Sequence, residues 1–135
     1  MFLQPKKLKY KKVRKGRLSK LEFKSNKLVF GTIGLKASES GTITARQIES
    51  CRQAISRKIK RKGKLWIRIF PDLPITSKPT ASRMGKGKGS VSHWGVKVSG
   101  GNVLFEICGI KDHKIILAAF KTGSTKLPIK TRVFT

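Results

Sequence analysis

The feature that most constrains the fold is the stretch TARQIESCRQAISRKIKRK at residues 44–62. Thr44 and Gln47 have the spacing of a capping box, in which each side chain accepts a hydrogen bond from the other residue's backbone N–H. Apolar residues then recur at helical spacing: Ile48, Cys51, Ile55 and Ile59. Gly63 supplies a residue that commonly ends a helix. The pattern predicts a helix over residues 44–62 that buries one face.

The other face of this helix is basic. On a helical wheel, Arg46, Arg57 and Arg61 lie opposite the isoleucines and Lys60 lies at the flank. Arg52 lies near the apolar side, so its side chain has to reach solvent or pair. Six of the eight residues from Arg57 to Lys64 are basic, whereas one or two cations satisfy a helix C-terminus. The surplus indicates contact with phosphate.

Several further segments indicate strands around this helix. Strand patterns occupy residues 27–36, 64–70, 92–99, 102–110 and 127–134. Gly100, Gly101 and Asn102 join two of them and predict a hairpin. Asp112 is a candidate N-cap for a second helix to about Thr125, which Gly123 weakens. Prolines at 71, 74 and 79 predict extended connections. Residues 1–135 are thus expected to form one α+β domain with two helices and mixed, mostly antiparallel strands.

The charge balance narrows the class of partner. The chain has 32 Lys and Arg against 6 Asp and Glu, a net charge of +26, and such self-repulsion calls for a polyanion. The longest apolar run, residues 115–120, is far shorter than the ~18 residues of a membrane span. The N-terminal residues lack the apolar segment of a secretory signal. Because the positive charge is spread along the whole chain, nucleic acid is favoured over a membrane surface or an acidic protein.

Two segments concentrate charge in extended chain. Residues 1–20 form a basic arm without an acid, in which Leu8, Tyr10 and Val13 could stack on RNA; the alternative is a solvated tail. Residues 80–90 form a long Gly/Lys loop that contains RMGKGKG at residues 83–89. Its glycines would let backbone amides approach phosphates closely, and the alternative is a flexible, soluble surface loop. The arm cations are Lys6, Lys7, Lys9, Lys11, Lys12, Arg14, Lys15, Arg17 and Lys20.

Catalytic and cofactor motifs are not apparent. GKGKG lacks the spacing of a nucleotide-binding loop, and the six acids are scattered singly. Cys51, His93, Cys108 and His113 do not have zinc-ligand spacing, so two reduced thiols and two ordinary histidines are expected, without a metal or cofactor. We therefore expect a binding protein, not an enzyme.

Four blocks carry a resemblance to a known family: LQPKKLKYKKVRKGR, GTITARQIESCRQAISRKIKRKGKLWIRIFPDLPITSKP, RMGKGKG and KLPIKTRV. In order and spacing they are similar to the large-subunit ribosomal protein sixteen family of bacteria and organelles. The resemblance implies an α+β fold seated on large-subunit rRNA, beside neighbouring ribosomal proteins and without a homo-oligomer. It also implies that the loop reaches towards the peptidyl transferase centre and aminoacyl-tRNA, and that Arg83 matches a position modified in some bacterial members.

Two sets of candidate residues follow from the cations and the resemblance together. The first is expected to bind rRNA and comprises Lys6, Lys7, Lys9, Lys11, Lys12, Arg14, Arg17, Arg46, Arg57, Lys60, Arg61 and Lys64. The second is expected to lie near tRNA and comprises Arg83, Met84, Gly85, Lys86, Gly87, Lys88 and Gly89.

Two questions stay open at this point. The alternative function is a free basic nucleic-acid chaperone or regulatory RNA-binding protein, which would use the same charge. The Lys- and Ile-rich composition, the short start and the segment FPDLPITSKP favour an organelle-encoded mitochondrial protein, with a plastid or the bacterial cytoplasm as alternatives.

Overall fold

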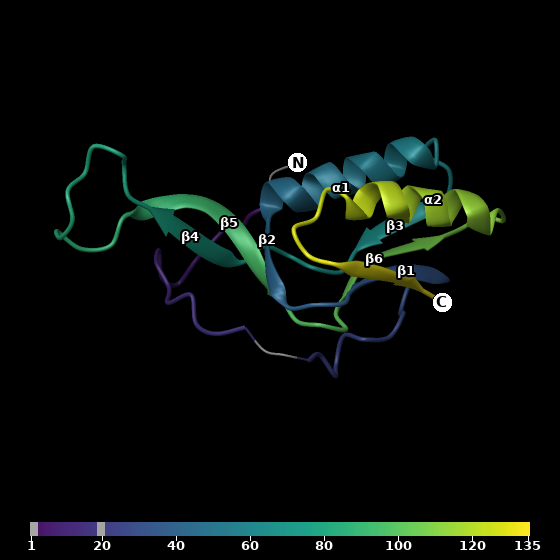
Figure 1. The fold of residues 1–135 in the computed structure, drawn as a ribbon, viewed down its shortest axis with the longest axis horizontal. Coiled ribbons are helices and arrows are strands. Elements are labelled where there is room, and N and C mark those ends of the chain that lie inside the picture. The colour runs from purple at the N-terminus through teal and green to yellow at the C-terminus, as the bar shows by residue number, and fades with distance from the viewer. Residues whose placement is uncertain (1–2, 19–20) are drawn as a thin grey trace.

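Two helices lie across one face of a four-stranded antiparallel sheet (Figure 1). The structure is a computed structural model, which describes residues 3–18 and 21–135. The strand order is β3–β6–β1–β7 in the first sheet and β2–β5–β4 in a second, three-stranded antiparallel sheet. In chain order the elements are β1 Ile33–Ala37, β2 Gly41–Thr44, α1 Ala45–Lys58, β3 Lys64–Ile67, β4 Leu73–Ser77, β5 Ser90–Val98, β6 Val103–Cys108, α2 His113–Ser124 and β7 Thr131–Phe134. The predicted α+β class is confirmed.

Helix α1 begins at the predicted capping box. The backbone N–H of Thr44 donates to Oε1 of Gln47 at 2.9 Å, and the N–H of Gln47 donates to the Thr44 hydroxyl at 3.3 Å. Ile48, Cys51 and Ile55 are fully buried, as the apolar periodicity predicts. The capping box therefore fixes both the start of the helix and the face that it turns inward.

The end of α1 differs from the prediction. The helix ends at Lys58, four residues before Lys62, and Ile59 is its C-cap. Lys60 N–H bonds to the carbonyl of Arg57 and Arg61 N–H to that of Ser56, which is the hydrogen-bond pattern of a Schellman motif. Lys60 and Arg61 have φ of 52° and 60°, in the left-handed region that Gly usually occupies. The predicted end was wrong because Lys60, not Gly63, turns the chain.

Helix α2 confirms its prediction, and Gly123 has a packing role there. Oδ1 of Asp112 accepts a hydrogen bond from Lys114 N–H at 2.9 Å, and the helix ends at Ser124 with Thr125 as its C-cap. A Cβ on Gly123 would lie 2.7 Å from Cγ1 of Ile55 and 3.2 Å from Sγ of Cys51. The glycine thus allows α2 to approach α1 closely. Both helices bury apolar residues against the sheet in one core: Ile48, Ile55, Ile116 and Phe120 with Leu35, Phe105 and Ile107.

The predicted hairpin between residues 92–99 and 102–110 is wrong. β5 pairs with β2 and β4, whereas β6 pairs with β1 and β3 in the other sheet. The end of β1 takes the backbone groups that a hairpin would use, because Gly101 N–H bonds to the Ala37 carbonyl and Ala37 N–H bonds to the Asn102 carbonyl. Residues 99–102 therefore carry the chain from one sheet to the other.

Buried Glu106 explains why β1 is shorter than predicted. Its Oε2 accepts hydrogen bonds from the backbone N–H groups of Val29, Phe30 and Gly31 at 3.2, 2.7 and 2.7 Å. These residues are thereby removed from strand pairing, and β1 begins only at Ile33. Arg68 forms an ion pair with the same carboxylate. Burial acts to raise the pKa of Glu106, but the hydrogen bonds and Arg68 together hold it below its ordinary value.

Two strands were not predicted, β2 and β4. β4 contains Pro74, which lies opposite Trp94 of β5 and lacks an N–H donor. It is tolerated because β4 is an edge strand of the three-stranded sheet. In the described part of the chain, no helix is long and apolar enough to cross a membrane.

Candidate nucleic-acid interface

The basic arm lies beside the β4–β5 hairpin (Figure 1). Its described portion, residues 3–18, contains no helix or strand, and Leu3 at its start is buried in the core cluster. Lys20 lies outside the described residues. The predicted arm cations are exposed: Lys6, Lys7, Lys9, Lys11, Lys12, Arg14, Lys15 and Arg17. The arm therefore presents its charges to solvent along one side of the hairpin.

The arm and the Gly/Lys loop contact each other directly. The Lys12 ammonium donates to the backbone carbonyl of Lys88 at 2.7 Å, and the Lys88 ammonium donates to the carbonyl of Val13 at 2.7 Å. Lys97 of β5 donates to the carbonyl of Arg17 at 3.4 Å. Two segments that the sequence analysis treated separately are thus joined, and Lys97, which nothing in its neighbourhood marked as functional, helps to hold the arm.

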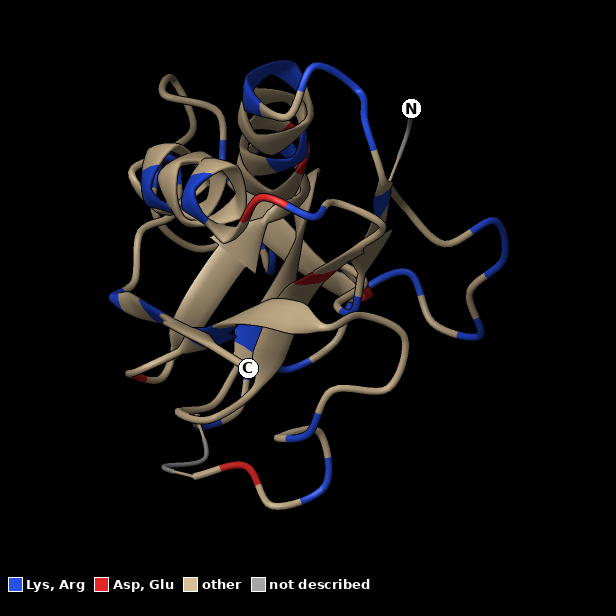
Figure 2. Ribbon diagram, turned by 90° about the vertical axis from the view of Figure 1, so that its right-hand side faces the viewer, with Lys and Arg blue, Asp and Glu red and all other residues tan. Residues whose placement is uncertain are grey.

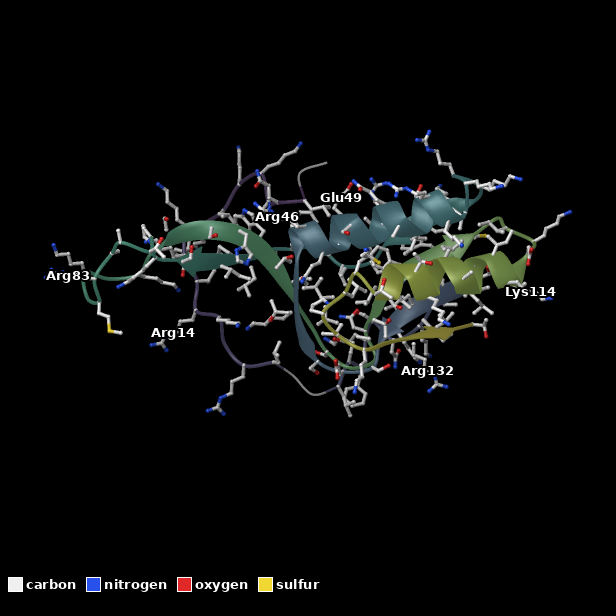
Figure 3. All side chains as sticks on the ribbon, turned by 45° about the horizontal axis from the view of Figure 1, so that its top comes forward. Arg14, Arg46, Glu49, Arg83, Lys114 and Arg132 are labelled. Carbon is white, nitrogen blue, oxygen red and sulfur yellow. The ribbon has the colours of Figure 1, made fainter. Side chains whose placement is uncertain are left out.

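The loop projects from the body of the molecule as the tip of the β4–β5 hairpin, with Arg83 near its far end (Figures 1 and 3). Residues 78–89 connect the strands, and Ser90 is already the first residue of β5. The chain turns at Gly85, Lys86 and Gly87, which have φ of 90°, 53° and 81°. All predicted loop residues from Arg83 to Lys88 are exposed, with Met84 at 98%.

The three loop glycines have two different roles. Gly85 and Gly87 have nothing within 4 Å of an added Cβ, so they are needed there for their backbone conformation. Gly89 lies against the backbone of Ser77 and Lys78 at the base of the hairpin, where a Cβ would clash. Lys78 donates to the Gly85 carbonyl at 2.6 Å. Close packing therefore fixes the base of the loop, and Lys78 holds the Gly85 carbonyl, while residues 83–88 stay exposed.

A basic hollow lies at the end of α1. It has a volume of about 410 Å³ and is lined by Arg52, Gln53, Ser56, Arg57, Lys60 and Arg61. Three predicted rRNA-binding residues thus come together. Arg52 was expected to pair or reach solvent, and it pairs with Glu49 at 2.7 Å. Arg52 and Arg57 lie within α1, and the Schellman turn, which was not predicted, brings Lys60 and Arg61 to the same hollow.

The same Arg52 controls the ionisation of Glu49. Its side-chain hydrogen bonds lower the pKa of Glu49, with a smaller contribution from Gln53 in the same direction, and burial opposes them. In return the Glu49 hydrogen bond raises the pKa of Arg52. The carboxylate is therefore already occupied and does not compete with phosphate for the remaining cations of the hollow.

Arg46 and Lys64 lie away from this hollow. Arg46 is exposed in the first turn of α1, at the opposite end of the helix (Figure 3). Lys64 begins β3, and its ammonium lies 5.3 Å from the centre of the Trp66 ring. The predicted cations thus form the arm with the loop, the α1 hollow, and these two outlying positions, rather than one continuous patch.

Positive charge dominates the surface between these groups. Lys and Arg are spread over the arm, the helix ends and the connecting loops, with few acidic positions among them (Figure 2). Among the described residues, no cluster of His, Cys, Asp and Glu could hold a metal ion. Cys51 is buried, which raises the pKa of its thiol to about 12. The fold and these cations define a small basic α+β protein of the polyanion-binding class.

Comparisons with known proteins identify the family within that class. The sequence profile described as Ribosomal protein L16p/L10e matches residues 5–134. The chain is 53% identical to the large ribosomal subunit protein uL16 of Bartonella henselae over 131 residues, covering 97% of this chain and 95% of that protein. It is 50% identical to the protein of the same name from Halorhodospira halophila, covering 96% and 94%. The chain belongs to the ribosomal protein L16p/L10e family, as its sequence motifs indicated.

Proposed function

We propose that this protein is a structural constituent of the large ribosomal subunit and binds large-subunit rRNA. The observation that carries the proposal is the match to relatives named large ribosomal subunit protein uL16 along nearly the whole chain. The net charge of +26 supplies a physical reason for an RNA partner. Residues 1–135 act as one domain in this proposal, and neighbouring ribosomal proteins complete its surroundings.

The proposed rRNA contacts are the exposed cations of the arm and of α1. Phosphate suits the hollow at the end of α1 because Arg57, Lys60 and Arg61 converge there. The arm contributes Lys6, Lys7, Lys9, Lys11, Lys12, Arg14 and Arg17, and Arg46 and Lys64 add two separate contacts. Arg68 is not part of the set because buried Glu106 occupies it.

We further propose that the loop helps to position aminoacyl-tRNA near the peptidyl transferase centre. The support is its projection from the body, its exposure from Arg83 to Lys88 and its similarity to the loop of the family. Arg83 provides a planar fork for phosphate or a stacked base, whereas Lys86 provides an adaptable cation. Gly85 and Gly87 leave the backbone open to a close approach by RNA.

Sedimentation of a cell lysate tests the ribosomal assignment. Nearly all of the protein should sediment with the large subunit, and stripping the ribosomes in high salt should release it. A substantial free pool at normal expression would instead support the alternative, a free RNA chaperone or regulatory binder.

The compartment requires a separate experiment. The matched relatives named above are bacterial. We propose a mitochondrial ribosome because the composition is rich in Lys and Ile. Fractionation of the source cells should place the protein in mitochondrial ribosomes. Its recovery in plastid or bacterial cytoplasmic ribosomes would contradict that location without affecting the ribosomal assignment.

A further inference from the structure

We propose that a hollow between α1, β5 and the start of the arm holds one unpaired RNA base. The hollow has a volume of about 730 Å³, in the range of sites that bind small ligands. It lies at the other end of α1 from the basic hollow, on the side marked by Arg46 and Glu49 in Figure 3. This inference rests on the proposed rRNA-binding function and adds a base site that borders the start of the arm and shares Gln53 with the basic hollow.

Three segments that are distant in sequence build the walls. The arm contributes Gln4, the first turns of α1 contribute Arg46 and Gln53, and β5 contributes Ser92, His93 and Trp94. The buried side chain of Leu3 fixes the arm at this point, and the capping box fixes the start of α1. The walls on either side of the hollow are therefore held by the core.

The lining suits a nucleobase. Trp94 is partly buried and supplies an aromatic surface on which a base can stack. Gln4 and Gln53 each carry an amide that both donates and accepts hydrogen bonds, as the edge of a base requires. The Gln53 amide already donates to Oε1 of Glu49 at 3.2 Å, which leaves its carbonyl oxygen as an acceptor.

The charges favour RNA over a basic peptide as the occupant. Glu49 is the one carboxylate among the described residues that line the hollow, and Arg52 and Gln53 already bond to it. Arg46 is exposed and makes no ion pair or hydrogen bond with the described residues, so it can meet the phosphate attached to the bound base. An aromatic, amide-lined hollow with a free cation complements a nucleotide.

The two tryptophans of the chain allow a direct test. In the full-length Trp66→Phe protein, Trp94 is the sole fluorescent indole. The probes are two RNA hairpins that are identical except that one contains a single unpaired adenosine. We expect that hairpin to quench Trp94 fluorescence and to bind about fivefold more tightly, or better, than the fully paired hairpin. In the Trp94→Leu protein the preference should be lost, whereas the Trp66→Phe control should keep it.

A second variant guards against misfolding. If the circular dichroism spectrum shows that Trp94→Leu does not fold, Gln53→Leu replaces it, because Gln53 is an exposed residue of α1. This variant should reduce the preference for the hairpin with the unpaired adenosine, because one hydrogen bond to the edge of the base is lost. Equal affinity for the two hairpins in the parent protein, or tight binding without a change in Trp94 fluorescence, would overturn the base site and leave rRNA binding intact. If neither hairpin binds, the RNA-binding function itself fails. Quenching by a large-subunit protein and not by the hairpin would replace the base with a protein contact.

Discussion

At the scale of single residues, several charged side chains occupy positions that are costly for folding. The cost is a strained backbone in one place and burial in another. Lys60 and Arg61 adopt left-handed backbone angles that cost non-glycine residues on the order of 1 kcal/mol each. Glycine would relieve this cost but would remove the cation from the α1 hollow. Glu106 is instead a fully buried anion. Three backbone N–H groups and Arg68 stabilise its carboxylate. At Lys60 and at Glu106, a suitable substitution can therefore separate the effect of the side-chain charge from the other contributions to stability.

Replacing Lys60 separates folding stability from RNA binding. We expect Lys60→Gly to raise the free energy of unfolding by about 1 kcal/mol, because the left-handed turn loses its Cβ strain. The matched control Lys60→Gln keeps the strain and removes the same charge. Both variants should bind large-subunit rRNA more weakly than the parent in filter binding, whereas only the glycine variant should gain stability in urea unfolding. A stability gain in both would show that repulsion among the cations of the hollow, and not backbone strain, is the cost.

The Glu106 carboxylate predicts how stability depends on pH. Its folded pKa lies below the ordinary value of 4.5, so its contribution is complete above about pH 4.5 and is lost as the pH falls through the folded pKa. The parent should lose stability in acid more steeply than Glu106→Gln, which should already be less stable by a few kcal/mol near neutral pH. Urea unfolding from pH 7 to pH 3 measures this. The exposed control Asp72→Asn should follow the parent, and parallel curves for parent and Glu106→Gln would contradict the role of the carboxylate.

At the scale of elements, local signals located both helices but not the sheet topology. The starts of α1 and α2 were predictable because Thr44, Gln47 and Asp112 cap their helices through neighbours within three residues. The prediction of a hairpin between β5 and β6 was wrong because the partner of β6 depends on distant residues. Ala37 of β1, for example, bonds to Gly101 and Asn102. β4 was missed because Pro74 reads as a loop unless its place at a sheet edge is known.

The sequence predicts which residues of the candidate interface are exposed cations. It does not predict which of these cations lie together in the fold. Exposed cations of the arm and loop follow from composition, since long runs of Lys and Arg without acids cannot be buried. The grouping of Arg52 with Arg57, Lys60 and Arg61 depends on the Schellman turn, and the arm–loop contact joins residues 76 positions apart. Such contacts carry no local signal in the sequence.

The contact between arm and loop predicts different effects for the two loop lysines. The Lys88 ammonium holds the Val13 carbonyl, whereas Lys86 makes no such contact with the described residues. Lys86→Ala should therefore slow aminoacyl-tRNA accommodation on ribosomes while leaving hydrogen exchange of the arm unchanged. Lys88→Ala should also slow accommodation, and in addition it should increase hydrogen exchange in residues 11–15. Protein occupancy on purified ribosomes is the control, and an unchanged accommodation rate for Lys86→Ala at full occupancy would contradict the role of the loop.

At the scale of the whole molecule, the apolar core and the cations occupy different parts of the structure. The core lies between the helices and the four-stranded sheet, and the arm and the loop extend away from it on the hairpin side (Figure 1). Buried Glu106 pairs with Arg68 and half-buried Glu49 pairs with Arg52, so most of the excess Lys and Arg is left for the surface. The net charge of +26 therefore lies mostly at the surface, where a polyanion can neutralise it without disturbing the core.

Because the cations lie at the surface and the apolar residues lie in the core, counterion release should dominate the binding of rRNA. If each of the 12 proposed rRNA-binding cations neutralises one phosphate, the slope of log affinity against log salt should be roughly −8 to −11, at about −0.7 to −0.9 per contact. Filter binding of the protein to isolated large-subunit rRNA across a salt series measures the slope. Arg57→Gln with Arg61→Gln should make it shallower by about 1.4 to 1.8 with unchanged circular dichroism, because both residues are exposed, whereas Ile55 is buried. Ile55→Asp should instead abolish folding by burying an unpaired charge. A parent slope near zero would refute the electrostatic account, and loss of helical signal in the arginine variant would show that these exposed residues support the fold as well as binding RNA.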